Sequence, residues 1–239
     1  MASADNVYVL IHGAWHASWC WRYVVPLLEL YGRVLAPDLP GHGKCFVDMR
    51  CIALSTYVDY VTNLVKAQDK PVVLVGHSLG GVIISQVAEN IPECIKRLVY
   101  IAAFVPRNKQ SLLYEASCSK SPGIAAELVL NEEENTLALL ASPRICEIFY
   151  NCCCKKDVEF ALSKLQVQPY RPLRDSISIS SSRFGQVKKL YIECLQDVAL
   201  AVEDQRRMHM KVHCDVVSLD TDHSPFFSAA DELVKAIIL

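Results

Sequence analysis

The chain has 239 residues, of which 52% are hydrophobic, and its formal net charge at pH 7 is -2. This length and apolar content suffice for one large buried core, as in an ordinary single α/β domain, and the nearly balanced charge gives no reason to expect nucleic acid or an anionic membrane as a partner. The first residues lack the basic stretch of a signal peptide and no run reaches about 18 apolar residues, so we expect no membrane insertion.

Short apolar runs alternate with amphipathic segments over the first hundred residues. An uninterrupted apolar run is typical of a strand buried on both faces of a parallel sheet, and an apolar stripe at helical spacing is typical of a covering helix. Their alternation predicts parallel strands joined by right-handed helical crossovers. The expected strands are 7–11, 33–36, 72–75 and 97–104, and the expected helices are 19–30, 55–66 and 82–88.

The alternation breaks after Pro106, and up to Arg183 the chain has no comparable strand. A helical insertion in an open sheet lies over the carboxyl ends of the strands, where ligands bind, so we interpret residues 106–183 as a helical lid. We expect one domain, with a core formed by 1–105 and 184–239. The expected lid helices are 123–131, 133–150 and 157–165, and the sheet resumes with strands 189–195 and 215–219 and helices 199–210 and 228–238.

A Gly-x-Ser-x-Gly motif, GHSLG, occupies residues 76–80 directly after the apolar run 72–75. At the end of a buried strand this is the nucleophile-elbow pattern of hydrolases, where a sharp turn strains the serine and small neighbours let strand and helix pass closely. The alternative is a turn glycine and a helix-capping serine. Because strand, turn and helix occur in the required order, we predict Ser78 as a nucleophile.

A serine nucleophile needs a base, because a neutral hydroxyl is a poor nucleophile. In hydrolases with this elbow the chain order is serine, acid, histidine, and His209, His213 and His223 lie late enough. His209 falls in a helical pattern and His213 precedes a strand. His223 alone lies in a loop directly after a strand, so we predict that it is the base, with a helix-capping role as the alternative.

The acid that orients the base should lie in the loop after the preceding strand. Asp197 is in that position, although an aspartate there could instead cap the following helix. Asp220 and Asp222 are rivals, but they would have to fold back to meet the His223 ring. Glu193 lies within the strand and would point sideways. We therefore predict Asp197.

Attack on an ester carbonyl develops negative charge on its oxygen, and backbone N–H groups must already be aimed there. Leu79 follows the nucleophile at the start of its helix and supplies one donor. The loop after the first strand supplies the second, for which we predict Ala14. His12 and His77 each flank a turn, and we expect them to be structural and to bond backbone groups.

The eleven cysteines are odd in number and form no C-x-x-C pair, which favours reduced thiols in the cytoplasm over a disulfide framework. Cys152, Cys153 and Cys154 are adjacent, so their side chains point in different directions and a zinc site is not expected there. We expect them to fill a loop or helix start and to be sensitive to oxidation.

At these motifs the chain resembles the α/β-hydrolase superfamily, in the branch that holds plant methylesterases, hydroxynitrile lyases and short bacterial esterases, including pyrethroid-hydrolysing ones. The stretches that carry the resemblance are VYVLIHGAWHASWCW, VLAPDLPGHG, VVLVGHSLGG, LVYIAAFVP, LYIECLQDVAL and SLDTDHSPFFS. It implies a mostly parallel central sheet flanked by helices, and it is weakest in the lid. At matching positions it implies Ser78, Asp197 and His223 as a triad, with Ala14 and Leu79 as oxyanion donors.

The resemblance also separates neighbouring activities. Hydroxynitrile lyases of this branch carry a threonine in place of Gly13 and a lysine directly after the catalytic histidine, where this chain has Ser224. A small uncharged residue there leaves nothing to stabilise cyanide, so an esterase is favoured over a lyase. Dehalogenases and epoxide hydrolases of this fold use an aspartate nucleophile, which Ser78 excludes.

We therefore expect a cytoplasmic serine carboxylesterase, monomeric or homodimeric, that needs no metal or organic cofactor. Its partner would be a small to medium hydrophobic ester, held in an apolar pocket under the lid. Candidate pocket residues, which are equally typical of simple core, are Trp15, Phe104, Leu112, Phe149 and Phe226. The alternatives are a lactonase, a hydroxynitrile-lyase-like enzyme of the same branch, and a hydrolase-fold receptor that binds a ligand without turnover.

Overall fold

A six-stranded parallel sheet forms the centre of the computed structural model, which describes residues 6–121 and 123–239. The strand order is β2-β1-β3-β4-β8-β9, so strands distant in sequence become neighbours, as where Leu10 pairs with Val75. The strands are β1 Asn6–Ile11, β2 Gly32–Leu35, β3 Val72–His77, β4 Ile95–Ile101, β8 Lys189–Cys194 and β9 Asp215–Leu219. The expected parallel sheet is confirmed.

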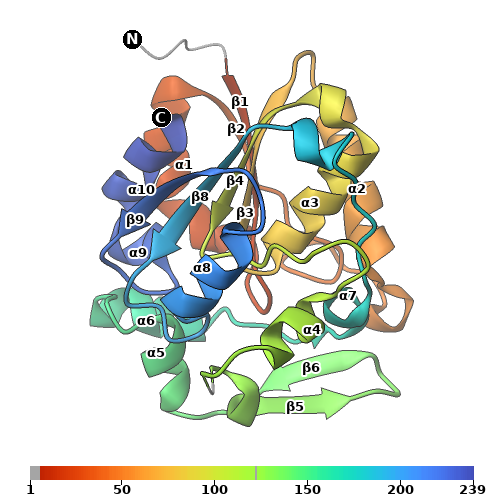
Figure 1. Ribbon diagram of the computed structural model, residues 1–239. Coiled ribbons are helices and arrows are strands. Elements are labelled where there is room, and N and C mark those ends of the chain that lie inside the picture. The colour runs from red at the N-terminus through yellow and green to blue at the C-terminus, as the bar shows by residue number, and fades with distance from the viewer. Residues whose placement is uncertain (1–5, 122) are drawn as a thin grey trace.

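Helices cover both faces of this sheet, with α1 against α10 on one face and α2 against α3 on the other (Figure 1). The inner strands are rich in buried apolar residues because both of their faces are covered, and all six residues of β3 are buried. The helices of the core are α1 Val24–Leu28, α2 Leu54–Lys66, α3 Gly80–Asn90, α8 Val202–His209, α9 Pro225–Ser228 and α10 Ala230–Ile238.

The helix expected over 19–30 is shorter than predicted. Tight 3₁₀ turns at Ser18–Arg22 and Glu29–Tyr31 flank the five-residue α1. Pro26 lies in the first turn of α1, where its missing N–H would have no helical partner in any case. The other expected core helices and strands are present, with ends displaced by a few residues.

Most of the chain between β4 and β8 forms a separate layer beyond the carboxyl ends of the sheet strands, and the part after Arg174 returns along α3 to the start of β8 (Figure 1). This layer, which we call the cap, contains helices and a three-stranded antiparallel sheet in the order β5-β6-β7. Its elements are α4 Leu112–Ser117, β5 Leu128–Asn131, β6 Thr136–Leu139, α5 Arg144–Phe149, α6 Lys155–Leu162, β7 Gln168–Pro169 and α7 Arg171–Arg174.

Two helices expected in the cap are wrong in whole or in part. The expected helix 123–131 ends in strand β5, and the first half of 133–150 holds strand β6, leaving only α5 as helix. In the turn between the strands, Asn135 adopts a left-handed φ of +53° and the Glu134 N–H donates to Asn131 Oδ1 at 3.1 Å. The third expected helix, 157–165, is confirmed as α6.

No helix in the part of the chain that the structure describes combines the length and the apolar character needed to cross a bilayer.

Candidate active site

The turn that joins β3 to α3 holds Ser78 in a left-handed backbone conformation, with φ at +51°. Such a conformation is unfavourable for a residue with a Cβ and persists only where the surroundings enforce it. The Ser78 N–H donates to Ile101 O at 3.2 Å, and its carbonyl accepts from the N–H groups of Gly81 and Phe104, both at 3.1 Å. The turn is therefore fixed by backbone bonds on both sides of the serine.

Glycines allow the neighbouring backbones to approach this turn. A Cβ on Gly76 would lie 2.6 Å from Gly80 O, and one on Gly80 would lie 2.7 Å from Ile11 O. On the other side, a Cβ on Gly13 would lie 2.9 Å from Ser78 Cβ. The loop after β1 thus packs directly on the serine, and any side chain at position 13 would displace one of the two.

The His223 ring lies in the loop after β9 and forms a short hydrogen bond with the acid predicted for it. Its Nδ1 is 2.7 Å from Asp197 Oδ2, in the loop after β8, and both side chains are buried. Asp197 Oδ1 accepts the Leu200 N–H at 2.8 Å. Burial raises the pKa of Asp197, while the neighbouring His223 and these donors favour its charged form.

Two neighbouring rings pack against the His223 ring. His77 is 4.6 Å away between ring centroids, and Phe149 of the cap stacks on it at 5.6 Å. His77 Nε2–H also donates to the His223 carbonyl oxygen at 2.8 Å, so His77 holds the backbone of the histidine as well as its ring. The structural role expected for His77 matches this bond.

Ser78 and His223 line the same cavity. Among the hydrogen bonds of the described residues, none joins the Ser78 hydroxyl to the ring. Bonds of this kind in free hydrolases are commonly long and shorten when substrate arrives.

The other candidate acids and bases have different hydrogen-bond partners or lie at the surface. Asp222 accepts from Ser224 N and Ser228 Oγ, and Asp220 accepts from the Gln196 side chain. Glu193 accepts from Arg206 and pairs with His209 Nε2 at 2.7 Å. His213, in the loop before β9, is exposed.

Ala14 and Leu79 both line the cavity and are buried. Within residues 6–121 and 123–239, neither of their backbone N–H groups has a protein acceptor. Two buried donors without a protein acceptor, at a cavity wall beside Ser78, are suited to receive an anionic oxygen.

The cavity has a volume of about 280 Å³ and lies between the sheet edge and the cap. Four of the predicted pocket residues line it: Trp15, Phe104, Leu112 and Phe149. Phe226 does not, because it is buried behind His77, 5.0 Å from that ring and 5.4 Å from Trp21. Apolar cap residues that the sequence did not single out, since nothing distinguishes them from ordinary core, are Leu113, Ile124, Leu128, Leu137 and Leu173.

The cavity has a buried apolar end and a more exposed mouth. Trp15, Leu137 and Phe149 form the buried end, where Trp15 Nε1–H donates to Leu137 O at 2.9 Å. Ser117 and Ala125 at the mouth are exposed. His223 is the one titratable side chain in the described lining, so the cavity favours an uncharged, apolar guest.

Buried imidazoles surround the site and are neutral. Burial lowers the pKa of His12 to about 4 and that of His16 to about 3. His12 Nε2 accepts the Leu39 N–H at 3.1 Å, so its proton is on Nδ1, which donates to Gly13 O. His12 therefore bonds backbone groups on both sides, as expected for a structural residue.

The three adjacent cysteines lie between α5 and α6. The backbone N–H of Cys152 donates to Asp222 Oδ2 at 2.7 Å, and Cys153 Sγ donates to the same oxygen at 3.3 Å. Within residues 6–121 and 123–239, no three His, Cys, Asp or Glu side chains gather as a metal site would require. The cysteines thus join the cap to the loop that carries His223.

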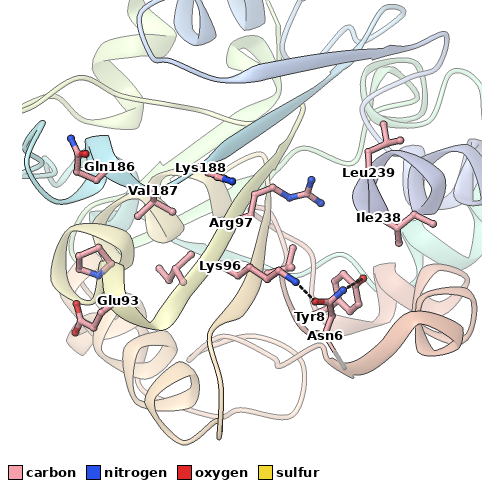
Figure 2. Close-up of a pocket in the computed structure, with 13 residues that line it drawn as sticks. Asn6, Tyr8, Glu93, Lys96, Arg97, Gln186, Val187, Lys188, Ile238 and Leu239 are labelled. Carbon is pink, nitrogen blue, oxygen red and sulfur yellow. Dashed lines mark hydrogen bonds between the residues drawn. The ribbon is translucent and has the colours of Figure 1, made fainter. Parts of the chain in front are cut away.

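A larger hollow, of about 580 Å³, opens at the opposite edge of the sheet. Figure 2 shows that Lys96, Arg97 and Lys188 lie around it, with Lys96 bonded to Asn6. No serine, cysteine or histidine lines it in the described chain. The smaller cavity is therefore the better candidate for the active site, because a serine and a histidine line it.

The fold is that of a hydrolase, and comparison with known proteins identifies the family. The chain belongs to the alpha/beta hydrolase family, whose model matches residues 8–236. Several relatives are named as esterases, and the chain is an enzyme of the carboxylic ester hydrolase class.

Two relatives match over nearly their whole length. Methylesterase 7 of Arabidopsis thaliana is 31% identical over 97% of this chain and 94% of its own, and polyneuridine aldehyde esterase of Rauvolfia serpentina is 30% identical over 99% and 96%. Putative methylesterase 11, chloroplastic, of Arabidopsis thaliana is 32% identical, but the chain spans only 63% of its length. A solved pyrethroid hydrolase from Sphingobium faniae JZ-2 superposes with a TM-score of 0.89 at 28% identity, covering 97% of this chain and 95% of that one.

Proposed function

We propose that the protein is a serine carboxylesterase in which Ser78, His223 and Asp197 act as a catalytic triad. The observation that carries the proposal is the 2.7 Å bond between His223 Nδ1 and Asp197, at the cavity that a strained Ser78 also enters. The whole chain would work as one domain, with residues 106–183 as its lid.

In the proposed mechanism, His223 takes the Ser78 proton as the hydroxyl attacks the ester carbonyl. Asp197 holds the ring with Nδ1 protonated, so that Nε2 is free to act as base. The N–H groups of Ala14 and Leu79 stabilise the oxyanion. His223 then returns the proton to the departing alcohol, and water releases the acyl group from Ser78 by the reverse steps.

The lining supports an uncharged hydrophobic ester as substrate. Its buried end is built from aromatic and aliphatic side chains, and no lysine or arginine of the described chain lines it, so a carboxylate on the substrate would have no counter-charge. Eleven free thiols are consistent with a reducing compartment such as the cytoplasm.

The residues at two positions argue against hydroxynitrile-lyase chemistry. Ser224 is fully buried, its N–H is bonded to Asp222, and it does not line the cavity. Gly13 has no room for a threonine side chain beside Ser78. A cyanide leaving group would therefore meet no cation, whereas a neutral alcohol needs only the proton from His223.

Hydrolysis of p-nitrophenyl acetate and butyrate by the purified full chain tests the proposal. We expect turnover that Ser78→Ala abolishes and that Ser163→Ala, at the exposed end of α6 and outside the cavity lining, preserves. Incubation with an organophosphate should add its phosphoryl mass to the wild type and not to Ser78→Ala. A panel that includes lactones separates an esterase from a lactonase.

Negligible turnover of every ester and lactone would contradict the proposal. If ligands then protected the cap from hydrogen exchange without being consumed, the protein would be a receptor built on the hydrolase fold.

A further inference from the structure

Both polar atoms of a buried glutamine on α8 form hydrogen bonds with the loop that carries the proposed acid. Gln205 has no exposed surface. Its Oε1 accepts the Cys194 N–H at 3.1 Å, and its Nε2 lies 2.8 Å from Leu200 O, 3.1 Å from Cys194 O and 3.2 Å from Asp197 Oδ2. One side chain therefore joins the end of β8, the acid and the end of the acid loop.

The chemistry of the amide suits this position. A buried carboxylate needs hydrogen-bond donors, and Asp197 Oδ2 receives the Gln205 amide beside the His223 Nδ1–H. An amide donates and accepts without adding charge, whereas a glutamate would place a second carboxylate beside the first. An apolar side chain would leave the Cys194 N–H without an acceptor inside the protein, which is unfavourable for a buried donor.

The helix that carries Gln205 is itself anchored to the cap. Arg207 donates to Glu115 Oε2 at 2.5 Å and to the Glu115 carbonyl at 2.9 Å, on α4. Asp204 accepts from Arg207 at 3.2 Å and from Ser119 Oγ at 2.5 Å, near the cavity mouth. Glu115 is buried, so this ion pair is largely shielded from water. The position of Gln205 is thus fixed from outside the acid loop.

We propose that Gln205 is a positioning residue that holds the Asp197 carboxylate at the distance and angle at which it orients His223. This rests on the proposed triad and adds a residue that touches neither substrate nor reacting atoms. Because it acts only through the acid, its loss lowers the rate of the chemical step without changing how the ester binds.

Gln205→Met tests the proposal, because methionine is of similar length and cannot donate to Asp197. We expect kcat for p-nitrophenyl butyrate to fall on the order of 10-fold with KM nearly unchanged, since a misplacement of about 1 Å can cost about 100-fold. The far-downfield proton resonance given by a buried histidine N–H bonded to a carboxylate should broaden or disappear. That resonance depends on the geometry of this one bond and not on general stability.

Arg206→Gln is the matched control, because Arg206 lies on the same helix and pairs with Glu193, away from the acid. It should retain kcat and the downfield resonance. If Gln205→Met does not fold, Gln205→Asn keeps the amide but is too short to reach Asp197, and the same losses are expected.

A Gln205 variant that folds with unchanged kcat and an unchanged resonance would overturn the positioning role. Absence of Ser78-dependent turnover in the wild type would instead overturn the esterase proposal. In that case the resonance, compared between wild type and Gln205→Met, still decides whether Gln205 positions Asp197.

Discussion

The carboxyl edge of the sheet and the cap meet at one cavity but differ in how tightly they are packed. At the sheet edge, a Cβ on Gly81 would lie 2.4 Å from Phe104 O. In the cap, Val129 and Leu130 of β5 leave 47% and 42% of their surface exposed. From this contrast we expect substitutions at the tightly packed backbone around Ser78 to be costly and substitutions at exposed positions of the cap to be tolerated.

The strongest test of this contrast is Asp197→Asn. An asparagine can donate to His223 Nδ1 and would favour the tautomer that leaves Nε2 protonated, so kcat should fall by about 10⁴-fold. Because the change is at the sheet edge, the loss should be similar for acetate and butyrate esters. Steady-state kinetics on both esters measures it, and a loss confined to one ester would contradict the division of labour.

Gly81→Ala examines the packing of the sheet edge directly. The new methyl group would meet the Phe104 carbonyl, so the backbones must separate, and we expect a loss of about 1–3 kcal/mol in the free energy of unfolding. In Gly185→Ala the nearest atom is Ser180 O at 3.4 Å, which is ordinary contact, so that variant is the control. Urea denaturation compares the two, and equal losses would refute the argument.

The buried imidazoles make the same edge sensitive to acid. Burial lowers the pKa of His12, His16 and His42 from 6.5 to about 4, 3 and 2. Below pH 6.5 these histidines take up protons in the unfolded chain but stay neutral in the folded one. Their burial therefore does not lower the free energy of unfolding above pH 6.5, and that free energy falls as the pH drops toward 4. Each histidine contributes about 1.4 kcal/mol per pH unit within that window.

Urea midpoints at several pH values measure this slope. His42→Gln should reduce it, whereas His213→Gln, at an exposed position, should leave it unchanged. A slope that responds equally to both substitutions would mean that the acid sensitivity arises elsewhere.

Leu137→Val probes the cap side of the comparison with the smallest expected effect. Removing one methylene from the buried end of the cavity should alter the preference between short and long acyl chains by about 10-fold in kcat/KM, while the smallest ester keeps its kcat. Val129→Thr, on the exposed face of β5, should leave that preference unchanged. A uniform loss for all esters would place Leu137 with the catalytic framework instead.

The same contrast explains what could be predicted from the sequence. Local or topological constraints produce recognisable sequence patterns. Three such patterns are the apolar strand before Ser78, the glycines that flank it, and the chain order of Asp197 and His223. Asp222 illustrates why topology was needed: it is closer in sequence to His223 than Asp197 is, yet its carboxylate binds the next turn and the cap.

The strands of the cap have no comparable pattern in the sequence. Residues 128–139 are rich in Leu and Glu, which favour helices, but their conformation is decided by partners far away in sequence. Leu137 pairs with Gln168 of β7 and accepts a bond from Trp15. Phe226 failed as a pocket residue for a related reason, because an aromatic side chain beside a catalytic loop can face either the cavity or the core.

The two free N–H groups at Ala14 and Leu79 belong to peptide bonds, which every residue except proline supplies. Apart from proline, which would also disturb the turn, no substitution of either side chain can delete the donor. Swapping an amide for an ester linkage by chemical synthesis would remove the hydrogen itself, so these contacts are hidden from alanine scanning and would be missed by any survey that counts side chains alone.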